Sequence, residues 1–318
     1  MKKILVCGAG GFIGTHLVRS LRAQGHYVIG ADLKFPEFSI TACDEFHQVD
    51  LRNQRSVTRL LRKDIDEIYQ LAADMGGAGY IFIGDNDADI MHNSAIINLN
   101  ILHEMTFKKI PKIFYSSSAC IYPAHNQQDA DNPILSEASA YPANPDSEYG
   151  WEKLFSERLY ASYARNYGID VRVARLHNVF GPEGAYTGGR EKAPAALCRK
   201  VIQSDTVEVW GPGTQTRSFM YIDDCVEGIH RLMASTHTEP INIGSDRMIA
   251  INDLVHLIST VIGKPVHVKN INGPQGVMGR VSDNTVIKQV LAWSPPDSLE
   301  TGLSETYKWI EQQLNAQA

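Results

Sequence analysis

The sequence predicts an α/β fold with a doubly wound parallel sheet and a smaller α/β part towards the C-terminus. Three observations support this prediction. Short apolar runs alternate with helical patterns through the first half of the chain, which is typical of a parallel sheet covered by helices on both faces. A glycine-rich turn separates the first apolar run from the first helical pattern. After Pro182 the pattern changes to short strands, glycine turns and helices.

The predicted sheet contains five buried strands in the first half of the chain. They are the apolar runs at 4–7, 27–31, 68–71, 113–116 and 171–175. The helical patterns between them occupy about 12–24, 54–63, 88–107 and 148–167. Two long segments interrupt the alternation: 75–87 is rich in glycine, and the polar segment 121–147 contains four prolines. Long connections of this kind are often lids or binding loops.

The change of pattern predicts two domains. The first comprises residues 1–176 and, after a return of the chain, about 219–236. The second comprises 177–218 and about 237–318. Because it begins with a strand, a glycine-rich turn and a helix, the first domain has the pattern of a Rossmann fold, which binds nucleotides at the carboxyl ends of its strands.

The composition restricts the kinds of binding partner and the cellular compartment that we expect for the protein. The chain has 318 residues, of which 43% are apolar and 21% charged, and its net charge of −6 argues against a nucleic-acid or anionic-membrane partner. No apolar run is long enough to span a bilayer, and the residues before the first strand are too few for a signal peptide. The five cysteines are scattered and form no Cys-x-x-Cys pair, so we expect no disulfide framework and no metal site. These features predict a cytoplasmic protein.

The first candidate site is the turn from Gly8 to Gly14, with glycines at 8, 11 and 14. This spacing brings backbone N–H groups and a helix N-terminus close to a pyrophosphate. Asp32 ends the second strand, where a carboxylate accepts hydrogen bonds from ribose hydroxyls and repels a 2′-phosphate. NAD is therefore favoured over NADP, although Lys34 lies close by. The expected cofactor-binding residues are Gly8, Gly11, Phe12, Ile13, Gly14, Asp32, Asp50, Leu51, Leu71 and Ala73, together with Tyr149 and Lys153.

The second candidate site consists of Ser118 at a strand end and the pair Tyr149 and Lys153. Residues four apart share one helix face, so the charge of the lysine can lower the pKa of the phenol. A general base needs a pKa near neutral pH. Ser118 can hold the substrate oxygen that the phenolate deprotonates. The three residues predict hydride transfer from a substrate alcohol to the nicotinamide.

Longer segments carry a resemblance that covers essentially the whole chain. The chain resembles the extended short-chain dehydrogenase/reductase family, most of whose members act on nucleotide-activated sugars. Beyond the N-terminal motifs, the segments that carry this resemblance are Arg217–Asp224, Asn242–Ser245 and Leu291–Pro295.

Within that family, the chain is most similar to the GDP-mannose 3,5-epimerases. The segments that carry this similarity are Leu71–Gly77, Ser117–Pro123, Gly188–Lys200 and Trp210–Phe219. The similarity implies that NAD⁺ oxidises the sugar at C4, which acidifies the C–H bonds at C3 and C5. Two groups on opposite faces of the ring then exchange protons at these carbons, and the hydride returns to C4. The similarity assigns the two acid–base roles to Cys120 and Lys192.

The same similarity implies a GDP-sugar substrate and a homodimer formed by the helices near 88–107 and 148–167. It places Met75, Gly76 and Gly77 in the loop that lines the sugar pocket, Asn178 and Glu191 near the sugar beside Lys192, and Lys200, Arg217 and Arg280 near the diphosphate. Charge-assisted contacts of these cations would hold an anionic substrate on an acidic protein. Plant enzymes of this group have an N-terminal extension before the first strand, so we expect a bacterial origin.

Three alternatives remain open at this stage. The segment after Gly77 and residues 124–140 depart from the plant pattern, so another GDP-hexose or a GDP-heptose is possible as substrate. A GDP-fucose synthase-like epimerase-reductase shares the segment around Cys120, but it uses a histidine where this chain has Lys192 and NADPH where Asp32 favours NAD. A non-catalytic NAD-sensing protein is the third alternative, against which the retention of Ser118, Tyr149 and Lys153 argues.

Overall fold

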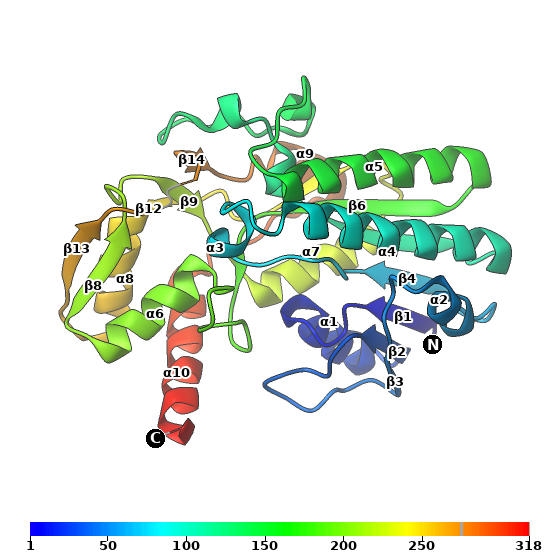
Figure 1. Cartoon of the computed structure of the whole chain (residues 1–318), viewed down its shortest axis with the longest axis horizontal. Helices are drawn as coiled ribbons and strands as arrows, with labels where there is room; N and C mark the ends of the chain where they lie inside the picture. The colour runs from blue at the N-terminus through cyan, green and yellow to red at the C-terminus, as the bar shows by residue number, and fades with distance from the viewer. Residues whose placement is uncertain (274–275, 318) are drawn as a thin grey trace.

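The central element is a seven-stranded sheet in which every pair of neighbouring strands is parallel. The computed structural model describes residues 1–273 and 276–317 (Figure 1). In spatial order the strands are β11 (Ile241–Ile243), β6 (Asp170–Leu176), β5 (Lys112–Ser118), β4 (Glu67–Gln70), β1 (Lys3–Cys7), β2 (Tyr27–Asp32) and β3 (Glu45–Gln48). The predicted doubly wound parallel sheet is thus confirmed, and each of the five predicted strands lies within two residues of its expected bounds.

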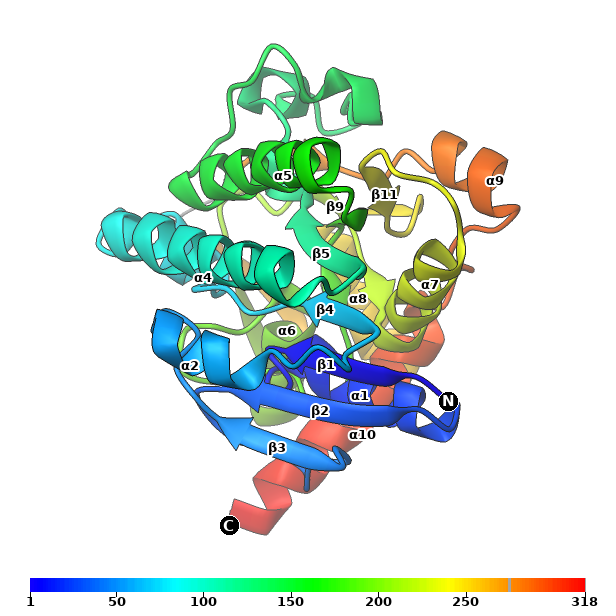
Figure 2. The ribbon, with the colours of Figure 1, turned by 90° about the vertical axis from the view of Figure 1, so that its right-hand side faces the viewer.

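Helices cover both faces of this sheet, as Figure 2 shows. One face carries α1 (Phe12–Ala23) and α7 (Ile222–Ala234), and the other carries α2 (Gln54–Leu60), α4 (Asp87–Lys108) and α5 (Glu148–Tyr167). Because side chains alternate along a strand, the two faces build separate cores. Ile4 and Val6 belong to the core under α1 and α7, while Leu5 and Cys7 belong to the core under α4 and α5.

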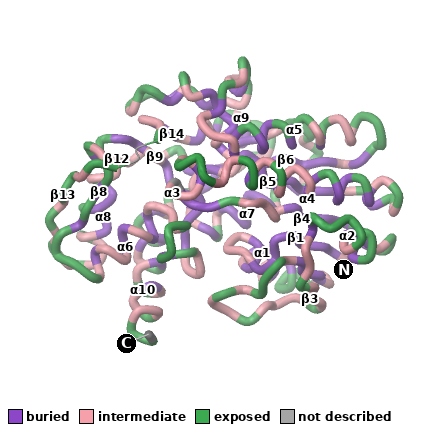
Figure 3. Tube along the Cα trace, viewed as in Figure 1, coloured by how far each residue is buried: buried purple, intermediate pink, exposed green. Residues whose placement is uncertain are grey.

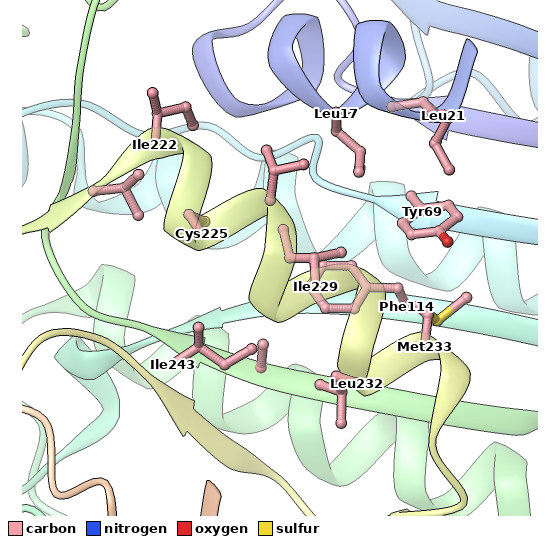
Figure 4. Packing of buried hydrophobic residues seen from close by; sticks show 14 of the residues in the cluster. Leu17, Leu21, Tyr69, Phe114, Ile222, Cys225, Ile229, Leu232, Met233 and Ile243 are labelled. Atoms are coloured by element: carbon pink, nitrogen blue, oxygen red, sulfur yellow. The ribbon is translucent and has the colours of Figure 1, made fainter. Parts of the chain in front are cut away.

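The core under α1 and α7 explains why the chain returns to the sheet near residue 219. In Figure 4, the apolar stripe of α7 points towards α1 and the sheet. Ile229 is fully buried in the same cluster as Leu17 of α1, Tyr69 of β4 and Phe114 of β5. An amphipathic helix with one apolar face must cover a sheet or another helix in this way.

A smaller α/β part lies beside the sheet and has its own apolar cluster. It contains α6 (Ala193–Gln203), β8 (Thr206–Trp210), β9 (Thr216–Ser218), β12 (Met248–Ala250), α8 (Ile251–Ile262), β13 (His267–Ile271), β14 (Gly279–Arg280) and α10 (Leu299–Gln317). The paired strands β7 (Val179–Phe180) and β10 (Met220–Tyr221) connect it with the sheet, and α9 (Thr285–Leu291) packs near β11. The two-domain division stays a prediction, and its predicted end at 318 lies outside the described residues. Since β11 is the seventh strand, residues 241–243 belong with the main sheet rather than with the smaller part.

The two long segments between strands contain only short helices. The glycine-rich segment holds α3 (Ala78–Ile81), and the proline-rich one holds the 3₁₀ turns η1 (Ala119–Ile121), η2 (Ala124–Gln127) and η3 (Glu137–Ala140). Figure 3 shows that burial concentrates along the sheet and falls towards the outer turns of α4 and α5. Within the described residues, none of the helices is both long and apolar enough to cross a bilayer.

Candidate active site

A cleft of about 720 Å³ lies along the carboxyl ends of the central strands. Parallel α/β sheets bind ligands at this edge because the loops after the strands converge there. The cleft brings together most of the residues that the sequence predicts for the site. Its lining includes Gly8, Gly11, Phe12, Ile13, Gly14, Asp32, Asp50, Leu51, Leu71, Ala73, Met75, Gly76, Ser118, Cys120, Tyr149, Lys153, Asn178, Lys192 and Arg280.

The glycine-rich turn makes room for a diphosphate at the start of α1. A Cβ atom on Gly14 would lie 2.0 Å from the carbonyl oxygen of Gly8, so only glycine allows this close approach. α1 begins with Gly11 as its N-cap, and neither a side-chain cap nor an acidic residue in the first turn occupies its N–H groups. An open helix N-terminus attracts anions, and this cradle therefore fits the pyrophosphate of a dinucleotide.

The Asp32 carboxylate is fixed at the end of β2, beside this turn. It accepts hydrogen bonds from the backbone N–H groups of Gly10 (2.9 Å) and Lys34 (3.2 Å). Across the cleft edge, Asp50 forms an ion pair with Arg52, whose Nη2 lies 2.8 Å from Oδ2. The position of Asp32 fits a ribose whose hydroxyls donate to a carboxylate, as expected for NAD.

The residues that the sequence predicts for hydride transfer come from two elements that meet at the cleft. Ser118 ends β5, while Ser147 caps α5 by accepting a hydrogen bond from Gly150 N (3.3 Å), which places Tyr149 in the first turn. The Lys153 Nζ donates to the Ser116 carbonyl (2.9 Å) and lies 5.6 Å from the centre of the Tyr149 ring.

Burial shifts the pKa values of both Tyr149 and Lys153. Burial, assisted by Cys120 and Glu152, raises the pKa of Tyr149, while its hydrogen bond with Ser118 lowers it. Burial lowers the pKa of Lys153, and the charge of Glu152 opposes this shift. A positive nicotinamide ring in the cleft would favour the phenolate form of Tyr149.

Cys120 lies in η1, two residues after Ser118, and faces a buried arginine. The Arg280 Nη1 donates to Cys120 Sγ (3.1 Å), and its Nη2 donates to the Asp146 carboxylate (3.0 Å). Its Nε donates to Oε1 of the buried Gln127 (2.6 Å). Burial disfavours the charge of Arg280, but Cys120 and Asp146 raise its pKa above the ordinary value. The structure thus places Arg280 at the sulfur.

Lys192 directly precedes α6 and reaches the cleft from the smaller part of the molecule. Its Nζ donates to the Gly76 carbonyl (3.3 Å), and burial lowers its pKa while Cys120 opposes that shift. A Cβ on Gly77 would lie 2.5 Å from the Glu191 carbonyl, so the Met75–Gly77 loop packs directly on the segment that carries Lys192. Cys120 and Lys192 therefore lie in one cleft although 72 residues separate them.

Four predicted substrate residues do not line this cleft: Gly77, Glu191, Lys200 and Arg217. The Lys200 Nζ donates to the Glu208 carbonyl (2.6 Å). Arg217 donates to the carbonyls of Thr216 and Val277, and burial, followed by the nearby Arg280, lowers its pKa to about 10. Glu191 pairs with Arg199 (3.4 Å), and its second carboxylate oxygen is buried without a hydrogen-bond partner among the described residues.

Two sets of contacts at and beside the cleft were not predicted from the sequence. The Arg190 guanidinium lies 4.2 Å from the centre of the Tyr80 ring, and the Tyr80 hydroxyl donates to Asp74 (2.8 Å). Gln127 and Asp146, which hold Arg280, lie in the proline-rich segment. Asp74 and Arg190 lie within the segments Leu71–Gly77 and Gly188–Lys200 that carry the resemblance, whereas Tyr80, Gln127 and Asp146 lie outside those segments. Their contacts depend on how separate parts of the chain pack together.

Comparison with known proteins identifies the family. Residues 4–244 match the model of the NAD dependent epimerase/dehydratase family. The chain is 46% identical to the GDP-mannose 3,5-epimerase of Arabidopsis thaliana over 98% of this chain and 83% of that protein. It is 29% identical to the GDP-L-fucose synthase of Sinorhizobium fredii over 96% of this chain and 95% of that protein.

Solved structures agree with this assignment. The UDP-glucose 4-epimerase of Thermotoga maritima, solved with UDP-glucose, superposes with a TM-score of 0.86 at 25% identity, covering 98% of this chain and 99% of that one. The UDP-glucuronic acid 4-epimerase of Bacillus cereus, solved with UDP-glucuronic acid and NAD, superposes with a TM-score of 0.83 at 27% identity. The match covers 98% of this chain and 99% of that one. The predictions of an epimerase and of NAD as cofactor are confirmed, and the chain belongs to the NAD dependent epimerase/dehydratase family.

Proposed function

We propose that this chain is a GDP-mannose 3,5-epimerase. The observation that carries the proposal is the presence of two acid–base side chains, Cys120 and Lys192, in the cleft that holds Ser118, Tyr149 and Lys153. Hydride transfer needs only the last three residues. The 46% identity to a GDP-mannose 3,5-epimerase supports the choice of sugar.

The reaction begins and ends at C4 of the sugar. Ser118 holds the C4 oxygen, and Tyr149 as phenolate takes the proton of the C4 hydroxyl. NAD, which the turn from Gly8 to Gly14 and Asp32 would hold, would supply the acceptor for the C4 hydride and the donor for its return. Lys153 stabilises the phenolate by its charge, and at the end Tyr149 gives the proton back to the C4 oxygen.

Between these two steps the ring carries a C4 ketone, which acidifies the hydrogens at C3 and C5. Cys120 and Lys192 approach the ring from different elements, so one group can remove a proton from one face while the other delivers a proton to the opposite face. Burial lowers the pKa of Lys192, which makes an amine base accessible nearer to neutral pH. Each inversion breaks one C–H bond and forms another, with no net redox change.

The remaining predicted residues belong to this proposal as substrate contacts. Met75, Gly76 and Asn178 border the sugar end of the cleft, and Arg280 adds positive charge there. Lys200 and Arg217 lie outside the described cleft lining, so their contact with the diphosphate requires the bound sugar nucleotide to extend towards β8 and β9. We further propose a cytoplasmic homodimer that pairs α4 and α5 of two copies, for which the exposed Phe107 and Phe155 provide apolar surface.

The test is incubation with NAD⁺ and GDP-mannose in deuterated water, followed by NMR. We expect deuterium at C3 and C5 and none at C4, because the C4 hydrogen travels as a hydride that does not exchange with water. Cys120→Ala should remove exchange at one or both carbons while C4 oxidation persists. Cys43→Ala, which changes a half-buried cysteine outside the cleft, serves as the control.

The outcomes separate the alternatives. Exchange at both carbons in Cys120→Ala would contradict the assigned acid–base role. Exchange only with another GDP-hexose or a GDP-heptose would reassign the sugar. Bound NAD without turnover of any GDP-sugar would indicate a non-catalytic NAD-sensing protein.

A further inference from the structure

Tyr80 lines the cleft from α3, the short helix of the glycine-rich segment. Its backbone N–H donates to the Gly77 carbonyl (2.9 Å). Its side chain packs directly on Gly76, because a Cβ atom on Gly76 would lie 2.6 Å from the Tyr80 Cβ and 2.8 Å from its Cγ. The Tyr80 side chain therefore supports the Gly76 backbone from behind.

Gly76 and Gly77 are the residues that contact the Lys192 segment. The Gly76 carbonyl accepts the hydrogen bond from Lys192 Nζ (3.3 Å). A Cβ atom on Gly77 would lie 2.5 Å from the carbonyl oxygen of Glu191 and 3.2 Å from the carbonyl carbon of Arg190. Gly76 thus holds the end of the lysine side chain, and Gly77 lies against the backbone just before it. A shift of these two glycines would move the amine.

Arg190 forms a second connection between Tyr80 and the Lys192 segment. Its guanidinium lies 4.2 Å from the centre of the Tyr80 ring, a favourable cation–π geometry. Arg190 is exposed and follows Gly188 and Gly189, whose φ angles are +84° and +81°. A Cβ atom on either glycine would meet none of the described atoms within 4 Å, so packing restrains this turn little. The contact with Tyr80 therefore ties the turn to α3.

The Tyr80 ring is itself anchored to α4. Its hydroxyl donates to Oδ1 of Asp74 (2.8 Å), and Asn93 Nδ2 of α4 donates to Oδ2 of the same carboxylate (2.8 Å). The backbone N–H of Asp74 donates to Ser94 Oγ of α4 (3.0 Å), and Asn86 Nδ2 donates to the Tyr80 carbonyl (3.3 Å). The ring is thus fixed to a long helix that covers the main sheet.

We propose that Tyr80 is a positioning residue for Lys192. Its ring, anchored through Asp74 to α4, supports the Gly76 carbonyl and the Arg190 side chain, and both hold the Lys192 amine in the cleft. This inference rests on the proposed acid–base role of Lys192 and adds a residue from the other wall of the cleft to it. An acid–base group must stay within hydrogen-bond reach of the proton that it transfers, and a small misplacement slows the transfer strongly.

Tyr80→Leu tests the proposal because it removes the ring and keeps an apolar side chain. Exchange at the carbon that depends on Lys192, which Lys192→Ala identifies, should slow by about three- to thirtyfold, the range of a cation–π contact converted to a rate. Leucine can still pack on the apolar cluster of Ile81, Ile90 and Tyr149 that Tyr80 contacts. C4 oxidation should therefore change less than exchange.

The position of Lys192 can also be measured without sugar. Burial lowers the pKa of Lys192, so an amine that moves towards water should titrate at higher pH. Burial and the hydrogen bond with Asp74 raise the pKa of Tyr80, so tyrosine and leucine are both neutral where Lys192 titrates. The shift therefore reports hydration of the amine and not a lost charge. The ionisable groups on the surrounding segments stay unchanged: Arg190 and Glu191 before α6, Asp74 before α3, Cys120 on η1, Tyr149 on α5 and Arg280 on β14.

The experiment compares the NAD-loaded wild type with Tyr80→Leu and Tyr80→Phe. Lysine labelled with ¹³C at Cε reports each amine, and Lys192→Arg assigns the resonance of Lys192. We expect Lys192 to titrate at higher pH in Tyr80→Leu. In Tyr80→Phe the titration and the exchange rate should stay near the wild-type values, because phenylalanine keeps the ring on Gly76 and under Arg190.

Tyr27→Leu is the matched control. The Tyr27 hydroxyl also donates to a carboxylate, that of Glu45 (2.8 Å), and Lys3 Nζ lies 5.5 Å from the centre of its ring. Tyr27 and Tyr80 are both partly exposed, but Tyr27 lies on β2 outside the cleft lining. This variant should leave the Lys192 titration and the exchange rates unchanged.

An unshifted Lys192 titration in Tyr80→Leu would overturn the inference. Equal slowing of C4 oxidation and of exchange would indicate a purely structural role and overturn it too, as would a Tyr80→Phe variant as impaired as Tyr80→Leu. If Tyr80→Leu does not fold, Arg190→Lys keeps the charge but loses the planar guanidinium, and an unshifted titration there would be equally decisive. The titration needs no sugar, so a wild type that turns over no GDP-sugar would refute the proposed function and leave this test valid.

Discussion

At the scale of single residues, Arg280 connects the sulfur of Cys120, the proposed acid–base group, with Gln127 and Asp146 of the proline-rich segment. Its guanidinium donates in three directions at once, to Cys120, to Asp146 and to Gln127. A planar guanidinium can satisfy three acceptors with fixed geometry, whereas an ammonium group is a compact point charge on a flexible stem. Arg280 therefore sets both the position and the electrostatic surroundings of Cys120.

Arg280→Lys tests this arrangement while keeping the positive charge. A hydrogen bond to a charged group contributes about 1.5–3 kcal/mol, so losing one should slow deuterium exchange at C3 or C5 by roughly ten- to hundredfold. C4 oxidation should change less, because Ser118, Tyr149 and Lys153 do not contact Arg280. The control is Arg247→Lys, which affects an arginine paired with Asp297 and Glu300 outside the cleft. Wild-type exchange rates in Arg280→Lys would refute this role.

At the scale of elements, the connection between β2 and β3 acts as a strap across the cofactor end of the cleft. Residues 33–44 form this strap, and five of them line the cleft: Leu33, Lys34, Pro36, Glu37 and Phe38. Phe38 packs against the smaller part of the molecule, with its ring 5.8 Å from Tyr186 and 5.0 Å from Trp309 of α10. Ser39 and Arg19 both contact the Glu183 carboxylate.

The strap should slow the release of NAD, which the reaction regenerates and does not need to exchange. We expect Phe38→Ala to raise the NAD dissociation rate by about three- to tenfold, since an aromatic pair contributes about 0.5–1.5 kcal/mol. Rapid dilution into a solution with a competing dinucleotide measures this rate. Ile40→Ala changes an exposed residue of the same strap, with 91% exposure, and should release NAD at the wild-type rate. Equal rates in both variants would show that the Phe38 contacts do not retain the cofactor.

The sequence predicted a helix, strand or turn correctly where the residue pattern that specifies it lies within that one element. The five predicted strands are short, mainly apolar runs, and the glycine spacing from Gly8 to Gly14 specifies a turn by sterics alone. β11 escaped prediction as a sheet strand because it has three residues and pairs with β6, which lies 67 residues earlier in the chain (Ile241 pairs with Ala174). Phe38 gave no signal either, because its partner Trp309 lies near the other end of the chain.

At the scale of the whole molecule, the candidate active site is formed by residues from both the main sheet layer and the smaller α/β part. Ser118 ends β5 of the main sheet, Cys120 lies in η1 directly after it, and Tyr149 and Lys153 lie on α5, which covers the sheet. Lys192 directly precedes α6 of the smaller part, and Arg280 lies on β14. The resemblance of whole segments to known epimerases brought Cys120 and Lys192 into one hypothesis. Periodicity and spacing could not do so, because they describe neighbours along the chain and contain no information on how distant segments pack.

The exposed apolar side chains of α4 and α5 bear on how the chain assembles. The two helices lie side by side in Figures 1 and 2 and expose apolar side chains: Leu99 (40%), Phe107 (66%), Trp151 (39%) and Phe155 (47%). Exposed large apolar side chains on two neighbouring helices favour an interface, and a stable dimer buries about 800 Å² on each partner.

We expect light scattering after gel filtration to give twice the chain mass for the wild type and a single chain mass for Leu99→Glu combined with Phe155→Glu. Two buried carboxylates on each copy would meet across a twofold axis without partners, which outweighs the apolar contacts of an ordinary interface. Val290→Glu matches Leu99 in exposure, 41% against 40%, but lies on α9, so this variant should remain a dimer. Because the cleft opens beside α5, the monomeric variant should still bind NAD, and a wild type that elutes as a single chain would refute the α4–α5 interface.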